Sequence, residues 1–173
     1  MRPVRTMLAV ALAAALCACA ETERIDAAGD VHAFLISIRD DDATGFEAHV
    51  DRPALKTQLR ARLMVDMAKT PKSPGTRLLV AALGRPLVDV IADQLVQPDV
   101  FLAVAELYGY SPDAPIPNRL IIAKALKPLD AERVCVTRSP NGACLLIFRN
   151  EDGVWRLVGF TGDSSLLRGA KGF

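Results

Sequence analysis

Two histidines, His32 and His49, are the residues best suited to metal binding or acid–base chemistry. His49 lies between Glu47 and Asp51, and an imidazole with two carboxylates is a ligand set that zinc accepts. Three polar side chains near the end of a predicted helix are, however, more commonly exposed to solvent. His32 has no cysteine or second histidine at ligand spacing. We therefore predict no metal site.

The sequence also offers little catalytic chemistry. It contains no GxSxG, HExxH, phosphate-loop or dinucleotide-binding motif. Ser164 and Ser165 have no neighbouring base in the sequence and are typical of a C-terminal tail. We predict no catalytic residue and no cofactor. A hydrolase assembled from distant residues is the least favoured alternative.

Cys135 and Cys144 remain in the chain however its N-terminus is processed, and an oxidising compartment favours a bond between them. Closing so short a loop would stabilise the fold by about 2–3 kcal/mol. Direct pairing across a hairpin requires a wide loop, with Pro140 in a type I turn. A tight turn at Asn141-Gly142 would instead place Cys135 opposite Phe148 and leave both thiols free. We favour the disulfide, as a structural crosslink.

Residues 1–18 have the parts of a secretory signal peptide. Arg2 and Arg5 give a basic start, an apolar, alanine-rich run extends from Met7 to Leu16, and small residues follow. The apolar run is about ten residues long, which is too short to span a bilayer as a helix. The sequence therefore indicates export.

The end of this segment, Leu16-Cys17-Ala18-Cys19, resembles the lipobox of bacterial lipoproteins: an aliphatic, a variable and a small residue, then the modified cysteine. The resemblance implies that Cys19 carries fatty acid, such as palmitate, and becomes the mature N-terminus. Ala18 and Ala20 also fit ordinary secretory cleavage, which would release a soluble protein. We favour the lipoprotein. Because Ala20 follows Cys19 where inner-membrane retention uses aspartate, we expect the outer membrane.

The predicted mature chain is nearly neutral. Removing the leader takes two of the 21 basic residues and none of the 20 acidic ones, which leaves a net charge of about −1. Nucleic-acid binding needs a concentrated basic surface, so neutrality and export both argue against it. The predicted partners are a membrane, through the lipid anchor, and either a protein or a hydrophobic ligand.

Apolar residues recur at helical spacing through the first half of the mature chain. One amphipathic helix is predicted by Val31, Phe34, Leu35 and Ile38. It should end at the acidic run 40–42, before a short helix around 44–49. A third helix, 54–69, should begin after Asp51 as N-cap and stop before a linker at 70–75.

Residues 76–96 are the most apolar stretch of the mature chain, and another helix is predicted from 99 to 108. One interpretation is a central core helix. The other is an apolar groove for a lipid, an acyl chain or a partner's helix. The groove would be lined by Leu79, Leu83, Leu87, Val90, Ile91 and Phe101.

After Asn118 the pattern changes. Segment 120–129 is ambiguous, but the runs 133–137, 144–148 and 154–160 are rich in β-branched and aromatic residues and are separated by turn sequences. They predict an antiparallel meander. Helices first and strands last indicate an α+β fold, with N-terminal amphipathic helices packed on a small C-terminal antiparallel β-meander. We expect Trp155 in its core rather than in a ligand-stacking cleft.

The expected organisation is a signal peptide (1–18), a lipidated N-terminus and tether (19–28), a single α+β domain (29–162) and a flexible C-terminal tail (163–173). One domain is the expectation for a chain of 173 residues.

Three stretches carry a resemblance to a known family: Ala43–Leu63, Arg85–Asp89 with Gln97-Pro98, and Asp152–Leu157. On these the chain resembles domain-of-unknown-function family 2939 of bacterial envelope proteins, from about residue 28 to 160. The resemblance implies helix caps and core positions, and it brings no catalytic residue and no established activity.

The sequence thus predicts a non-catalytic cell-envelope lipoprotein, exported and membrane-anchored in the periplasm, with a structural or protein-binding role. The alternative is a carrier of a lipid or another hydrophobic ligand in an apolar pocket.

Overall fold

The computed structural model describes residues 22–69, 89–107, 110–137 and 142–161. Helices come first: an N-terminal helix at residues 22–39, α2 (Ala43–Ala48), α3 (Arg52–Lys69), a helical segment at 89–95, α5 (Pro98–Leu107) and α6 (Arg119–Ala125). Four strands follow: β1 (Leu126–Pro128), β2 (Arg133–Thr137), β3 (Cys144–Glu151) and β4 (Val154–Phe160). They form one antiparallel sheet in the order β1-β2-β3-β4. The predicted α+β fold is confirmed.

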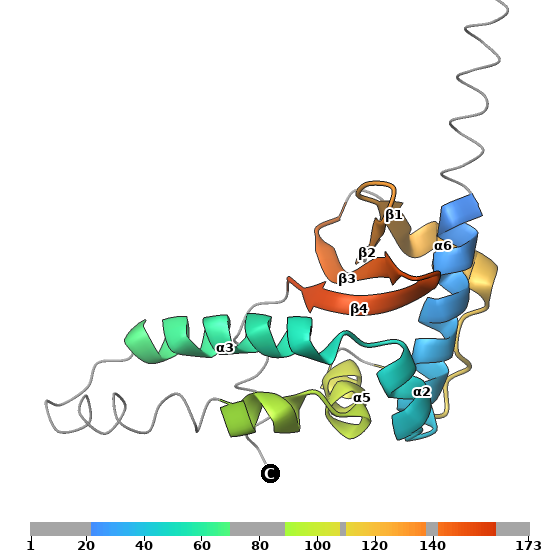
Figure 1. Cartoon of the computed structure of the whole chain (residues 1–173). Helices are drawn as coiled ribbons and strands as arrows, with labels where there is room; N and C mark the ends of the chain where they lie inside the picture. Colours follow the sequence, from blue (N-terminus) through green and yellow to red (C-terminus); the bar gives the residue numbers. More distant parts are fainter. Residues whose placement is uncertain (1–21, 70–88, 108–109, 138–141, 162–173) are drawn as a thin grey trace, which may run out of the picture.

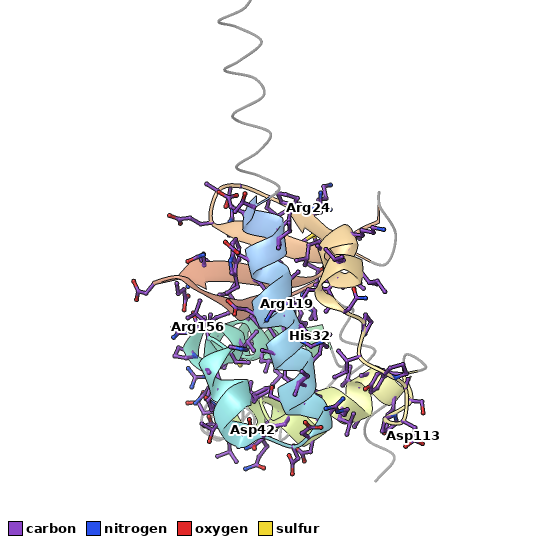
Figure 2. All side chains as sticks on the ribbon, turned by 90° about the vertical axis from the view of Figure 1, so that its right-hand side faces the viewer. Arg24, His32, Asp42, Asp113, Arg119 and Arg156 are labelled. Carbon is purple, nitrogen blue, oxygen red and sulfur yellow. A yellow bond between two sulfur atoms is a disulfide. The ribbon has the colours of Figure 1, made fainter. Side chains whose placement is uncertain are left out.

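The N-terminal helix crosses in front of the sheet (Figure 2). Its apolar stripe of Val31, Phe34 and Ile38 is buried, as the spacing predicts. The chain is already helical at residue 22, the first described residue, and Ala27 and Ala28 are fully buried in the core. The structure therefore differs from the expected boundary, because most of the segment taken as a tether, 19–28, belongs to this helix. Alanine has the highest helix propensity, but it gives little apolar periodicity to detect in a sequence.

The junction between α2 and α3 is built by two aspartates. Asp42 caps α2 by accepting a hydrogen bond from the Thr44 amide at 3.1 Å, and Asp51 accepts one from the Ala54 amide at 2.9 Å. The side-chain oxygen of such a residue satisfies an amide that the first helical turn leaves unpaired. Between the two caps, Val50 forms a parallel bridge with Leu157 of β4. The predicted cap at Asp51 is confirmed.

The sheet exceeds the predicted meander by one strand, β1. Leu126 aligns with Val136 and Pro128 with Val134, at the edge of the sheet where proline costs no internal hydrogen bond. The β3–β4 turn is as predicted from its sequence. Asp152 and Gly153 both have positive φ, 54° and 85°, as the central residues of a two-residue type I′ hairpin turn require.

The outer edge of β4 is covered by helical elements, which fixes the helices on the sheet (Figure 1). The Trp155 amide donates to the Asp30 carboxylate at 2.7 Å, and the Leu157 amide donates to the His49 carbonyl at 2.9 Å. Gln58 of α3 pairs with Phe160, accepting from its amide at 3.0 Å and donating to its carbonyl at 2.6 Å. These contacts satisfy polar groups that an open strand edge would expose.

Aromatic side chains fill the space between the helices and the sheet. Phe34 contacts Phe46, Phe101 and Phe148, with ring centroids 5.6–5.9 Å apart. Phe148 is fully buried on β3, and Trp155 is 2% exposed on β4. The interpretation of Trp155 as a core residue is confirmed, and these rings contribute through burial and edge-to-face contact.

Helical segment 89–95 runs antiparallel to α3. Lys56 pairs with Asp93, and one turn further along α3 Arg60 pairs with Asp89. Ala92 is fully buried in the core. The rest of the apolar stretch, from 76 to 88, lies outside the described residues. Among the described residues, which are coloured in Figure 1, no helix is long and apolar enough to cross a membrane.

Candidate functional site

The three polar residues considered for metal binding turn to different partners. Glu47 pairs with Arg52 of α3, while Asp51 caps α3 and pairs with Arg149 at 3.1 Å. His49 is the C-cap of α2, and its ring is partly buried. Within the described ranges, no group of three metal-ligating side chains occurs. Ser164 and Ser165 lie outside those ranges.

Burial lowers the pKa of His49, since a charged imidazole loses hydration there. The Asp30 carboxylate acts in the opposite direction, and Arg156 adds to the lowering. His49 Nδ1 is buried without a hydrogen-bond partner. The neutral ring is therefore the form that this junction accommodates.

A row of three arginines crosses the sheet, which the sequence reasoning did not anticipate. Arg133, Arg149 and Arg156 are aligned on β2, β3 and β4. Carboxylates balance them: Arg149 Nε donates to Glu151 Oε1 at 3.0 Å, and Arg156 Nη1 donates to Glu151 Oε2 at 3.2 Å.

Burial alone would raise the pKa of Glu151, but the hydrogen bonds from Arg149 and Arg156 outweigh it and lower that pKa. The row thus consists of paired charges that link the sheet to the α2–α3 junction. The signal in the sequence was an arginine in or directly after each of the three predicted strand runs, and only the strand register shows that Arg133, Arg149 and Arg156 align.

Cys135 and Cys144 form a disulfide, with Cα atoms 5.4 Å apart. The predicted bond is present, but the register that we expected for it is wrong. Cys135 aligns with Ile147, and Cys144 aligns with Thr137. An irregularity between Val136 and Thr137 shifts the register there, so the two cysteines approach without facing each other directly.

The predicted apolar groove is only partly within the described residues. Leu79, Leu83 and Leu87 lie outside them. Phe101 packs against Phe34 and Phe46, as part of the core, whereas Val90 is 60% exposed and Ile91 is 37% exposed. Because three of the six residues lie outside the described ranges, the groove stays a prediction.

The end of the domain that follows the lipobox is well defined. Two residues, Ala20 and Glu21, stand between Cys19 and residue 22, the first residue that the structure describes, which is already helical. Arg24 of that helix donates to the Ala123 carbonyl of α6 at 2.8 Å. An added Cβ at Gly29 would lie 3.7 Å from the Arg119 guanidinium carbon. Because Arg24 contacts Ala123 and Gly29 lies beside Arg119, α6 runs antiparallel to this helix (Figure 2).

The outer surface at this end is unusually apolar. Four aliphatic residues are exposed there: Ile25 on the N-terminal helix, Leu120 and Ile121 on α6, and Leu129 in the β1–β2 turn. Lys124 on α6 and Lys127 on β1 are exposed as well. We call these six residues the anchor-side surface.

A family model described as "Protein of unknown function (DUF2939)" matches residues 7–104. The chain belongs to this family. The DUF2939 match covers Ala43–Leu63, Arg85–Asp89 and Gln97-Pro98, and it ends before the sheet, so Asp152–Leu157 lies beyond it. No curated protein and no solved structure matches the chain.

Within the DUF2939 stretches, the residues that the structure describes have structural roles. Phe46 and Leu55 are fully buried, Asp51 caps α3, and Pro98 is the first residue of α5, where its fixed φ suits a helix start. These roles agree with what the resemblance implied, namely caps and core positions.

Proposed function

We propose that this protein is a cell-envelope lipoprotein, lipidated on Cys19, whose small α+β domain has a structural or protein-binding role without catalysis. The observation that carries the proposal is the position of the lipobox cysteine directly ahead of the folded domain. Leu16-Cys17-Ala18-Cys19 supplies the modification site, and the chain is already helical and part of the domain at residue 22, three residues after Cys19.

This spacing would hold the domain at the membrane. A fully extended chain spans at most about 3.5 Å per residue, so the first helical turn would lie within about 10 Å of the modified cysteine. The N-terminal helix is packed into the core through Ala27, Ala28 and Val31. The anchor would therefore restrain the whole domain.

The disulfide supports an exported protein. Cys135 and Cys144 are bonded in the sheet, and such bonds persist in oxidising compartments such as the periplasm. Because Ala20 follows Cys19, we place the protein in the outer membrane rather than the inner membrane.

The non-catalytic role rests on how the described polar residues are used. Asp30 and Asp51 satisfy backbone amides, Glu47 and Glu151 pair with arginines, and burial favours the neutral form of His49. Catalysis generally needs a polar cleft that brings a nucleophile to a base. The described polar residues instead support the packing of helices on the sheet.

Metabolic labelling with a fatty acid tests the proposal. The wild-type protein should incorporate label, and Cys19→Ala should abolish it. Cys17→Ala is the matched control and should keep the label, because the lipobox leaves that position variable. Labelling of Cys19→Ala, or a mature N-terminus at Glu21 in the wild type, would overturn the proposal.

A further inference from the structure

Four large aliphatic side chains of the anchor-side surface are exposed to solvent. Leu120 is 66% exposed, Ile121 is 55% exposed, and Ile25 and Leu129 are 45% and 40% exposed. Ile122 and Ala123, on the opposite side of the same short helix, are buried. Helix α6 is thus apolar on both sides, and its outer side has no covering element among the described residues. A clustered exposed apolar surface marks an interaction site.

The location of this surface relates it to the membrane. The Arg24–Ala123 hydrogen bond places the end of α6 beside the first turn of the N-terminal helix. Arg119, at the start of α6, lies beside Gly29. At 1.5 Å per residue, residue 29 is about 10 Å along the helix from residue 22. The surface therefore lies alongside the part of the domain that Cys19 would bring to the lipid.

The local charge fits an anionic lipid surface. Residues 119–128 include Arg119, Lys124 and Lys127 and no acidic residue, although the mature chain is nearly neutral. The neighbouring N-terminal helix carries Glu23, Asp26 and Asp30 with Arg24 over residues 22–30, so the basic character belongs to α6 and β1. The neighbouring Asp130 is already paired with Arg133 at 2.6 Å. Basic and aliphatic side chains together are the composition of helices that lie in a membrane interface.

We propose that the anchor-side surface docks onto an anionic lipid surface and lays the outer flank of α6, with Lys127 of β1, against the membrane. The proposal rests on the lipidated Cys19 of the proposed function, and it adds a defined orientation of the domain. The lipid anchor supplies the first attachment. Leu120, Ile121 and Ile25 contact the interface, and Lys124 and Lys127 face the headgroups.

The test uses the full-length lipidated protein in protein-free vesicles containing phosphatidylglycerol. In the mature protein, Cys17 has been cleaved off with the signal peptide, Cys19 is lipidated, and Cys135 is bonded to Cys144. An introduced cysteine is therefore the free thiol to which a fluorophore can be attached. Leu120→Cys carries the probe at the proposed contact. Val90→Cys is the matched control, since Val90 is 60% exposed on a segment remote from α6 (Figure 1).

An environment-sensitive probe at position 120 should shift to the blue in these vesicles and lose fluorescence to quenchers carried on the lipid chains. The probe at position 90 should do neither. Lys124→Glu with Lys127→Glu should weaken the quenching at position 120, because reversed charge repels the anionic headgroups.

Flotation of the vesicles separates the two ways in which this experiment can fail. Protein that does not float with the vesicles is not anchored, which overturns the proposed function and the docking with it. Protein that floats while position 120 remains unquenched overturns the docking alone and leaves the surface to a protein partner. Equal quenching at positions 120 and 90 also overturns it, since the contact would then be non-specific.

Discussion

His49 closes the C-terminus of α2, and its carbonyl accepts the Leu157 amide of β4. Its side chain has the chemistry of a metal ligand or a proton acceptor, but its position is that of a packing residue. Its neighbours Glu47 and Asp51 are likewise committed, to Arg52 and to the first turn of α3. At the scale of single residues, polar groups that could bind a ligand hold the helix junction together.

The lowered pKa of His49 predicts a pH-dependent stability. A histidine whose pKa is lower in the folded state than its ordinary value of 6.5 binds protons more readily when unfolded. Its stabilising contribution is present above that ordinary value and is lost as the pH falls through the folded pKa. His49→Gln should therefore reduce the loss of unfolding free energy between pH of about 7.5 and about 5, measured with urea. An equally steep loss in the variant would contradict this.

At the scale of secondary-structure elements, the edge of β4 determines how the helices sit. Asp30 contacts Trp155, and Gln58 contacts Phe160, over sequence separations of 125 and 102 residues. The Gln58 side-chain amide donates to the Phe160 carbonyl and accepts from the Phe160 amide. It therefore makes the two hydrogen bonds that a neighbouring strand would make with this residue. Gly159 allows this approach, since an added Cβ would lie 3.1 Å from Gln58 Oε1.

Replacing Gln58 with methionine, which has a similar shape and makes no such bonds, should lower the unfolding free energy by about 1–2 kcal/mol. The neighbouring exposed residue supplies the control: Thr57→Ala should change stability by no more than about 0.5 kcal/mol. Urea unfolding of both variants measures the difference. If the Gln58 variant lost no more stability than the control, the edge contact would contribute nothing.

Elements that form through contacts between neighbouring residues could be predicted from the sequence, whereas elements that depend on pairing between distant residues could not. The stripe of Val31, Phe34 and Ile38 and the Asp152-Gly153 turn are local patterns, so the sequence revealed both. Strand β1 was missed because Leu126-Lys127-Pro128 is too short to show alternation. The disulfide could be inferred from compartment and spacing, but its register could not, since that depends on an irregularity in a long-range pairing.

For the candidate site, the sequence identified Cys19 through a local motif. It did not identify the anchor-side surface. Leu120 and Ile121 resemble core residues until Ile122 and Ala123 are seen to occupy the buried side of α6. Of the predicted groove residues that the structure describes, Phe101 packs in the core and Val90 is exposed, because exposure depends on which elements lie beside a helix.

At the scale of the whole molecule, the domain begins close to the lipobox. The helix is present from residue 22, where the described residues begin, and its described part contributes Ala27, Ala28 and the Arg24–Ala123 hydrogen bond. A short tether leaves a domain little freedom to move away from its anchor. In the lipidated protein that we propose, the orientation of the domain at the membrane would then be determined by the domain's own surface.

A chain that begins at residue 29 should be less stable than one that begins at residue 22. It loses two buried alanine side chains, at about 0.8 kcal/mol for each buried carbon, and one hydrogen bond of about 1 kcal/mol. We expect a loss of about 2–3 kcal/mol in unfolding free energy, measured by urea denaturation of the two soluble proteins. Identical denaturation midpoints would show that residues 22–28 are a tether after all.

The pairing of Asp30 with Trp155 also sets the order of events during synthesis. The N-terminal helix leaves the ribosome early, but its acceptor for the Trp155 amide and its core contact with Phe148 wait for strands near the other end of the chain. Contacts of such long sequence separation form slowly. The packing of the N-terminal helix on the sheet can therefore be completed only after residues 154–160 have been synthesised. Until then, the apolar side of that helix lacks its partner in the sheet, and the nascent domain has no closed core.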